Sequence, residues 1–179
     1  MQTYILLLRG INVGGHRKIK MAEFKTELQK IEMQEVKTYI QSGNIVFKYG
    51  KVAESTLTTV IEGLILKKYG FEVSALVLTA ENFADIFNNN PYLPERENEI
   101  EKLYCTLLYE IPEPFKIKTL EMVEASGDKF IIAGTCLYFY YENGYGKSKL
   151  NNPVVESKLK VKATTRNWKT MTKLIEMIE

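Results

Sequence analysis

Histidine, cysteine and long apolar runs are all scarce in this chain of 179 residues. It has one histidine, His16, and two cysteines, Cys105 and Cys136. A structural zinc site needs about four sulfur or imidazole ligands, so the composition excludes a zinc centre, and we expect neither a metal nor a cofactor. Both cysteines lie inside apolar, strand-like runs, which favours buried thiols over a disulfide framework.

The apolar runs are too short for a membrane. The longest stretch, residues 130–141, falls well below the roughly 20 residues that a membrane-spanning helix needs. Near the start only residues 5–8 are consecutive aliphatics, too few for the core of a signal peptide. We therefore expect a cytoplasmic protein without a membrane partner. The apolar share of 45% and the charged share of 26% are those of an ordinary globular protein.

A strong excess of either charge is also missing, since 24 lysines and arginines balance 22 acids to a net charge of +2. The distribution is nevertheless uneven. Residues 1–22 contain four lysines and arginines and no acid, and residues 145–173 contain eight against a single glutamate. Such asymmetry can mark a binding site for an anion. Two solvated basic faces that balance one acidic face would produce the same pattern.

The first part of the chain predicts a β-α-β-β-α-β order. A buried strand is expected at 3–8, amphipathic helices at 21–31 and 57–65, and strands at 36–40, 45–48 and 73–78. This order is typical of the ferredoxin-like plait, in which both helices cover one face of an antiparallel sheet. We therefore predict a ferredoxin-like subdomain over residues 1–79.

The middle of the chain, residues 80–101, is predicted to connect two subdomains. A helix is expected over residues 80–87, with Thr79 as its N-cap. The glutamate-rich stretch that follows, up to Glu101, is predicted to be an exposed connection.

Residues 102–179 begin the same pattern again. We expect a strand at 103–109, a helix that opens at Pro112 or Pro114 with Phe115 on its apolar side, and a hairpin of strands at 129–132 and 136–141. A short helix at 153–159 and a terminal helix capped by Thr165 are predicted to follow. The predicted fold class is α+β, with two ferredoxin-like subdomains that have antiparallel sheets, plus a C-terminal helix.

A glycine-rich loop follows the first strand and precedes the first helix. It reads Gly10-Ile11-Asn12-Val13-Gly14-Gly15-His16. The dinucleotide-binding fingerprint is excluded because Asn12 stands where its second glycine belongs. Glycines still allow a backbone to approach a ligand closely, and several N–H groups can converge on an anion. A turn that only needs positive φ angles would use the same glycines, so both interpretations stay open.

Two further basic segments lie near the other end of the chain. Gly146-Lys147-Ser148 is not a nucleotide-binding P-loop, because Tyr141 replaces the first glycine of that motif. Thr165-Arg166-Asn167 is predicted to open the terminal helix, whose free N–H groups would attract an anion. Trp168 is expected in the core, and the aromatic residues 138–141 are expected to pack rather than to bind RNA. No arrangement of nucleophile, histidine and acid is recognisable, so the catalytic residues, if any, are unknown.

Four motifs in order resemble a known family. They are the residues 6–15 around the glycine-rich loop, the segment Thr38-Tyr39-Ile40-Gln41-Ser42-Gly43-Asn44, the run 145–150, and the run 163–168. Together they resemble the bacterial family catalogued as domain of unknown function 1697, over nearly the whole chain. The resemblance implies an α+β fold of two plait-like subdomains. It implies no activity, cofactor or catalytic residue.

These observations lead to one hypothesis of function with two alternatives. The hypothesis is that the glycine loop, the Ser42 turn, the Lys147 segment and the start of the terminal helix form one basic cleft that binds a phosphate-bearing small molecule or a nucleic-acid backbone. The alternatives are an enzyme that acts on a phosphorylated small molecule and a protein–protein interaction module. The oligomeric state is not predicted. The candidate ligand-binding residues are Arg9, Asn12, Gly14, Gly15, Ser42, Asn44, Lys147, Ser148, Lys149, Thr165, Arg166 and Asn167.

Overall fold

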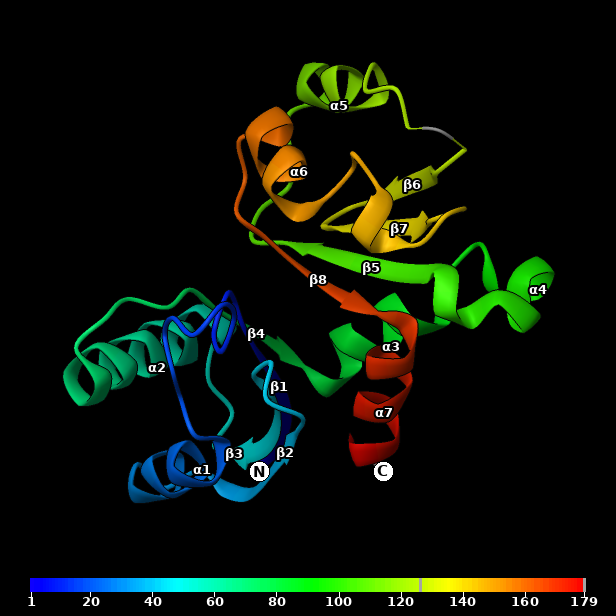
Figure 1. The fold of residues 1–179 in the computed structure, drawn as a ribbon. Helices are drawn as coiled ribbons and strands as arrows, with labels where there is room; N and C mark the ends of the chain where they lie inside the picture. Colours follow the sequence, from blue (N-terminus) through cyan, green and yellow to red (C-terminus); the bar gives the residue numbers. More distant parts are fainter. Residues whose placement is uncertain (126, 179) are drawn as a thin grey trace. The chain divides into compact units, whose positions relative to one another are not determined.

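The computed structural model describes residues 1–125 and 127–178, and these form two compact units (Figure 1). Unit 1 comprises Met1–Phe87 together with the terminal residues from Lys173 onward, and unit 2 comprises Asn88–Thr172. Each unit contains a four-stranded antiparallel sheet with helices on one face. The predicted α+β class of two ferredoxin-like subdomains with a C-terminal helix is therefore confirmed.

Unit 1 follows the predicted β-α-β-β-α-β order, and its sheet has the strand order β2-β3-β1-β4. Its elements are β1 (Gln2–Leu8), α1 (Met21–Lys30), β2 (Gln34–Tyr39), β3 (Asn44–Tyr49), α2 (Glu54–Tyr69), β4 (Ala75–Thr79) and α3 (Ala80–Asn88). Thr79 caps α3 as predicted, since its Oγ1 accepts a hydrogen bond of 3.1 Å from the backbone N–H of Asn82.

The core of unit 1 lies between its sheet and the helices α1 and α2. Because successive strand residues point to opposite faces, Leu6 and Leu8 of β1 face the helices. They pack with Phe24 of α1 and Ile61 of α2, all of which are buried. Val60, within the helix expected at residues 57–65, is 46% exposed, because it lies one residue off the stripe formed by the buried residues of α2.

Unit 2 repeats this architecture with the strand order β6-β7-β5-β8. Its elements are α4 (Leu93–Arg96), the 3-10 helix η1 (Glu97–Lys102), β5 (Leu103–Leu108), α5 (Pro114–Glu121), β6 (Lys129–Ala133), β7 (Cys136–Tyr140), the 3-10 helix η2 (Tyr145–Lys147), α6 (Asn152–Leu159) and β8 (Ala163–Asn167). The last helix, α7 (Trp168–Ile178), starts in unit 2, and its later residues belong to unit 1.

The two sheets match in register as well as in order. Leu8 pairs with Ala75 in unit 1, and Leu108 pairs with Ala163 in unit 2. In both units a glutamate of the preceding helix accepts a hydrogen bond from the backbone N–H of the first residue of the last strand. Glu62 Oε1 accepts from the N–H of Ala75 at 2.9 Å, and Glu156 Oε1 accepts from the N–H of Ala163 at 2.8 Å. The two units are therefore structural repeats, although the sequence shows no repeat.

The segment around Thr165 is a strand, so the predicted helix N-cap at Thr165 is wrong. The strand β8 continues to Asn167, and the helix starts at Trp168. The residue that caps α7 is Asn167, whose Oδ1 accepts a hydrogen bond of 2.8 Å from the N–H of Thr170. Threonine favours strands as well as N-caps, and the pairing of β8 with β5 decides between the two. Trp168 is buried, as predicted.

The glutamate-rich stretch forms the helices α4 and η1, and its glutamates Glu95, Glu97 and Glu101 are exposed, while Glu99 is half-buried. Glu99 lies at its centre and accepts hydrogen bonds from Arg96 at 2.7 Å, Lys102 at 2.8 Å and the hydroxyl of Tyr140 at 3.0 Å. These three donors lower the pKa of Glu99 to about 2. The cluster attaches α4 and η1 to β7 and so orders the segment.

Three other expectations from the sequence concern α5, a membrane helix and a metal site. Phe115 was predicted on the apolar side of α5, but it is 63% exposed, and Leu120 is the buried residue of this helix. Among the described residues, no helix is both long and apolar enough to cross a membrane. In the same part of the chain no three His, Cys, Asp or Glu side chains gather as a metal site would require.

Candidate functional site

Two connections are much longer than their counterparts in the other unit. The connection between β1 and α1 spans residues 9–20, whereas the equivalent one in unit 2 spans residues 109–113. The connection between β7 and α6 spans residues 141–151, whereas the equivalent one in unit 1 spans residues 50–53. The short connections are enough to join the same strands and helices in the other unit. The joining of these elements therefore does not explain the extra length, and both long connections carry basic motifs noted in the sequence.

The side chain of Asn12 holds the loop of residues 10–18, called here the glycine loop. Its Oδ1 accepts a hydrogen bond of 2.9 Å from the N–H of Ile19, and its Nδ2 donates to the carbonyl of Ile19 at 2.9 Å. The same Nδ2 donates to the carbonyl of Gln41 at 2.6 Å. Asn12 has a φ of 56°, which asparagine tolerates better than most residues. It therefore joins both ends of the loop to the β2–β3 turn.

The turn of residues 41–44 packs directly on the end of β1. The N–H of Leu8 donates to the carbonyl of Gly43 at 2.8 Å. Gly43 has a φ of 77°, and a Cβ on it would lie 2.6 Å from the Cβ of Leu8. Asn44 is fully buried, and its Nδ2 donates to the Oγ of Ser42 at 2.8 Å. The polar side chains of this turn thus maintain its shape.

The outer part of the glycine loop presents backbone amides and cations to solvent. Gly14 and Gly15 are exposed, with φ angles of 58° and 79°, and their N–H groups donate no hydrogen bond within the described residues. Arg17 and Lys18 are exposed next to them, and neither forms an ion pair with a described residue. Backbone turns whose N–H groups converge form anion-binding concavities, and exposed glycine amides without an acceptor are the groups that such a site needs.

The second basic segment lies in unit 2 at the end of the sheet where β5 begins. The ring of Tyr145 stacks on Tyr104, with centroids 5.1 Å apart. The Oγ of Ser148 accepts from the N–H of Leu150 at 2.9 Å, so this hydroxyl shapes its own turn. Lys147 and Lys149 are exposed. The segment thus combines an ordered backbone with two solvated cations.

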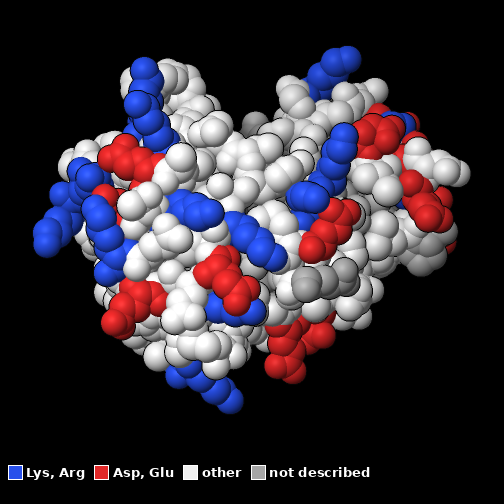
Figure 2. Space-filling view, turned by 90° about the horizontal axis from the view of Figure 1, so that it is seen from below, with Lys and Arg blue, Asp and Glu red and all other residues white. Residues whose placement is uncertain are grey.

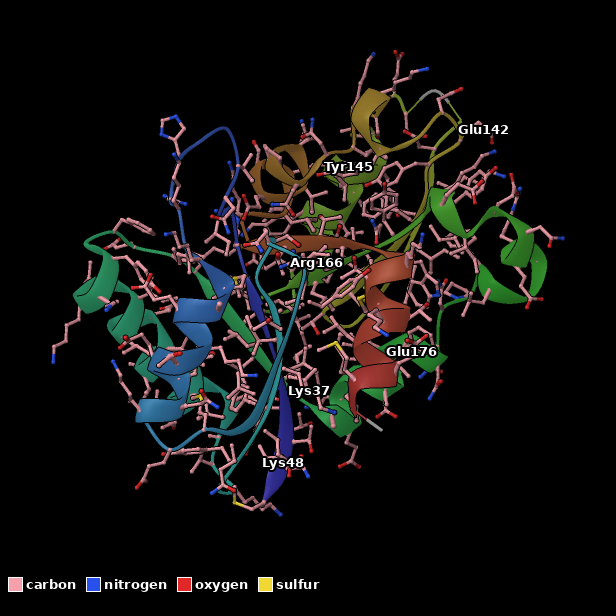
Figure 3. The ribbon with its side chains drawn as sticks, turned by 60° about the horizontal axis from the view of Figure 1, so that its bottom comes forward. Lys37, Lys48, Glu142, Tyr145, Arg166 and Glu176 are labelled. Carbon is pink, nitrogen blue, oxygen red and sulfur yellow. The ribbon has the colours of Figure 1, made fainter. Side chains whose placement is uncertain are left out.

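The residues of β8 point to opposite faces of the second sheet. The Oγ1 of Thr165 donates to the Oδ1 of Asn152 at 2.9 Å, which connects the strand to the start of α6. Arg166 (labelled in Figure 3) is buried. Its Nη1 donates to the Oγ1 of Thr164 at 2.8 Å and to the carbonyl of Thr165 at 2.9 Å. Burial lowers the pKa of its guanidinium to about 10. Arg166 is a strand residue, so the prediction that it lies at the start of the terminal helix is wrong.

The structure thus groups the predicted site residues into two sets, one in each unit. Unit 1 brings the glycine loop and the Ser42 turn together through Asn12 and Gln41. Unit 2 joins the end of the 141–151 connection to β8 through Asn152 and Thr165. The sequence hypothesis that all four segments meet at one cleft stays a prediction.

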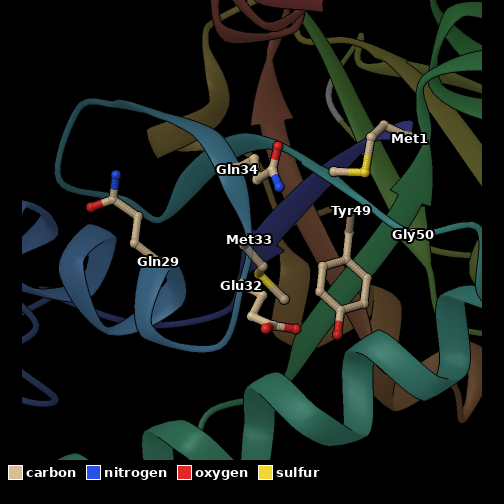
Figure 4. A pocket seen from close by; sticks show the side chains of 7 residues that line it. All are labelled: Met1, Gln29, Glu32, Met33, Gln34, Tyr49 and Gly50. Atoms are coloured by element: carbon tan, nitrogen blue, oxygen red, sulfur yellow. The ribbon is translucent and has the colours of Figure 1, made fainter.

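Two hollows of unit 1 suit an anion less well than the glycine loop. One cavity of about 640 Å³ lies between α1 and the ends of β1 and β3 (Figure 4). Its only charged side chain is Glu32, which would repel an anion. A second hollow, of about 690 Å³, has Lys51 but also Glu54 on its wall. On the face of the molecule shown in Figure 2, lysines and arginines are interspersed with acids. Compared with the two hollows, the glycine loop has cations and amides without an acceptor among the described residues, and its residues 10–18 include no carboxylate.

Two of the predicted ligand-binding side chains hold backbone in the structure, and one residue that orders a loop was not singled out in the sequence. Asn12 and Asn44 were predicted to contact the ligand, yet both side chains are used to hold backbone. Tyr145 was not considered, although it orders the start of the 141–151 connection by stacking. Its position beside two glycines, in Asn143-Gly144-Tyr145-Gly146, was the available signal, because an aromatic residue in a flexible stretch needs a packing partner.

Comparisons with known proteins agree with this architecture. A family model described as "Protein of unknown function (DUF1697)" matches residues 1–138. No curated protein matches the chain. A solved structure, that of the conserved bacterial protein SP0830 from Streptococcus pneumoniae, is similar with 27% sequence identity and a TM-score of 0.79. The similarity covers 99% of each chain, so both units and their order are shared with that protein.

Proposed function

The chain belongs to the DUF1697 family of proteins of unknown function, and we propose that it binds a phosphate-bearing ligand through the glycine loop of unit 1. The observation that supports this most directly is the hydrogen bonding of the loop. Asn12 fixes both ends of the loop, while Gly14 and Gly15 are exposed and their N–H groups have no hydrogen-bond acceptor among the described residues. An ordered loop of this kind binds an anion without a further loss of backbone entropy.

The charge around the loop supports an anion in particular. Residues 1–22 contain no acid, so no carboxylate near the loop in sequence competes for Arg17 or Lys18. Arg17 lies against the loop, since a Cβ on Gly10 would be 3.6 Å from its Nη1. A guanidinium can donate two parallel hydrogen bonds to a phosphate, while the glycine amides donate from the backbone. The proposed ligand contacts are therefore the amides of Gly14 and Gly15 and the side chain of Arg17.

Binding is the role that these residues support, ahead of catalysis or protein association. Residues 10–18 offer backbone amides and cations, which bind an anion, and they contain neither a hydroxyl or thiol nucleophile nor an acid that could work with His16. The two free thiols are in keeping with a reducing compartment such as the cytoplasm.

The test is a ligand titration with a matched charge control. Inorganic pyrophosphate, ATP and a single-stranded oligonucleotide are titrated against the full chain and followed by thermal shift and calorimetry. A bound ligand at 100 times its Kd adds about 2.7 kcal/mol of stability, which raises the melting temperature measurably. We expect Arg17→Gln to weaken binding about tenfold or more, because a charge-assisted hydrogen bond contributes about 1.5–3 kcal/mol.

The control is Lys67→Gln on the exposed side of α2, which removes the same charge from a residue outside the proposed ligand contacts. It should leave the Kd within about twofold, because it removes no hydrogen-bond donor to the ligand. If none of the three probes raises the melting temperature, or if Lys67→Gln weakens binding as much as Arg17→Gln, the proposed site is wrong. Among the probes, only the oligonucleotide should show an affinity whose logarithm falls linearly with the logarithm of salt concentration.

The part of the hypothesis that concerns unit 2 has its own test. We propose that Lys147 and Lys149 of the 141–151 connection contact the same phosphate-bearing ligand. In that case Lys147→Gln should weaken binding of whichever probe the glycine loop takes, by a factor similar to that of Arg17→Gln. A Kd equal to that of Lys67→Gln would show that the 141–151 connection does not take part in binding that probe.

A further inference from the structure

The sheet of unit 2 contains both cysteines of the chain as a close pair. The Sγ of Cys105 on β5 lies 2.7 Å from the Sγ of Cys136 on β7. In the register of these strands Cys105 is opposite Tyr138 and Cys136 is opposite Leu107. The two cysteines are therefore diagonal neighbours on one face of two adjacent strands. Both thiols are free and buried.

The distance between the sulfurs lies between that of a bond and that of an ordinary contact. A disulfide is about 2.05 Å long, and non-bonded heavy atoms rest at about 3.5 Å or more. The two thiols are held closer than separate sulfurs normally rest, and only a small side-chain movement is needed to join them. We propose that Cys105 and Cys136 form a redox-active pair, a site at which a peroxide converts the two thiols into a disulfide between β5 and β7.

The reaction balances with hydrogen peroxide as the oxidant. One cysteine, as its thiolate, attacks a peroxide oxygen, which breaks the O–O bond and gives a sulfenic acid and, after protonation of the hydroxide, one water. The thiol of the other cysteine then attacks the sulfenic sulfur, forms the S–S bond and releases the second water. Overall, two thiols lose two electrons and two protons, and one peroxide is reduced to two waters.

The surroundings of the pair determine the rate of this reaction and the lifetime of its product. Burial raises the pKa of the Cys105 thiol well above its ordinary value, so little thiolate is present at neutral pH. We therefore expect slow oxidation compared with an exposed, activated cysteine. The same burial shields the disulfide from attack by external thiols, so the oxidised form should persist until the sheet opens. The closed ring runs from Cys105 to Cys136 and contains α5 and β6.

The test counts thiols in the full chain before and after oxidation. The reduced protein is incubated in its folded state with hydrogen peroxide, quenched with catalase, unfolded in guanidinium chloride, and labelled with N-ethylmaleimide for intact-mass measurement. Untreated protein should carry two labels. Treated protein should carry none and be lighter than the unlabelled reduced chain by two hydrogen atoms. Dithiothreitol in guanidinium should restore two labels.

The single variants Cys105→Ala and Cys136→Ala serve as controls. Each leaves one thiol without its neighbour, so no loss of two hydrogens within the chain is possible. The comparison of oxidised and reduced wild type does not depend on these variants folding, and its oxidised form should also melt at a higher temperature. Treated wild type that still carries two labels would overturn the proposal. So would oxygen atoms added to either cysteine, located by peptide mapping because exposed methionines such as Met122 also take up oxygen from peroxide, or a covalent dimer in a non-reducing gel.

Discussion

The contact between Gly43 and Leu8 allows a quantitative test of how the β2–β3 turn supports the candidate site. Replacing Gly43 by alanine places a Cβ 2.6 Å from the Cβ of Leu8, closer than real Cβ atoms approach other carbons. Leu8 cannot move away easily, because its N–H donates to the carbonyl of Gly43 at 2.8 Å and it is paired with Ala75 of β4. The new methyl group must therefore displace the turn.

The cost of Gly43→Ala has two parts. A φ of 77° disfavours any residue with a Cβ, at about 1–2 kcal/mol. Overpacking a well-filled core adds about 1–3 kcal/mol. We expect the free energy of unfolding to fall by about 2–5 kcal/mol, a large share of the ~5–15 kcal/mol that stabilises a typical domain. Urea unfolding followed by circular dichroism measures this change.

Gly70→Ala is the matched control for the backbone part. Gly70 ends α2 with a φ of 76°, and a Cβ on it would meet no atom within 4 Å. It should therefore cost about 1–2 kcal/mol from the backbone alone. The difference between the two variants isolates the collision with Leu8. If both lose the same free energy of unfolding within about 0.5 kcal/mol, the turn yields freely and the reasoning from the 2.6 Å approach is refuted.

Three further predictions concern polar contacts. Asn12→Ala removes three hydrogen bonds of the glycine loop, so we expect a loss of about 2–4 kcal/mol and faster amide exchange at Gly14 and Gly15; unchanged exchange would show that Asn12 does not order the loop. The pKa of Glu99 is about 2 in the folded chain against an ordinary value of 4.5. The ionised Glu99 therefore stabilises the fold fully above pH 4.5, and this stabilisation is lost as the pH falls toward 2. Glu99→Gln should lack this acid-dependent loss, and parallel curves of urea midpoint against pH for the variant and the wild type would contradict the prediction. Asn167→Ala should cost about 1 kcal/mol by removing the cap of α7, while Asn167→Ser, which can keep the cap, should cost less in the same urea titration.

Hydrophobic periodicity was enough to predict most of the fold. The pattern of Met21, Phe24 and Leu28 placed α1, and the β-rich runs on either side of the Ser42 turn placed β2 and β3, in agreement with the structure. Local patterns failed where a non-local partner decides the outcome. Thr165 is suited to a strand and to an N-cap alike, and only the pairing of β8 with β5 selects the strand.

The acidic segment illustrates the same limit for charged residues. The glutamates of residues 95–101 suggest a solvated connection when they are counted along the chain. Glu99 is instead held by two cations of its own segment and by Tyr140, a residue 41 positions away. Without the position of Tyr140 on β7, the sequence offers no reason to single out this glutamate among its neighbours.

Within the candidate site, the sequence singled out segments by composition but did not reveal the contacts of their side chains. The glycine loop and the Ser42 turn stood out by composition, and they do lie together. That Asn12 holds the backbone while Arg17 stays exposed depends on carbonyl positions at Ile19 and Gln41, which no motif records.

The internal repeat offers a criterion for function that neither unit offers by itself. Where the two units agree, as in the pairing of Leu8 with Ala75 and of Leu108 with Ala163, a residue is explained by the fold. Where they differ, the fold gives no reason for the additional residues. Residues 9–20 and 141–151 are two connections without an equally long counterpart, and both carry exposed cations. A loop that serves only to join two elements is expected to be short and tolerant of change. Replacing the outer residues 13–17 by a short turn keeps Asn12 and the buried Ile11 and Ile19. This change should therefore leave unit 1 folded, with cooperative unfolding, and abolish its binding of phosphate-bearing probes.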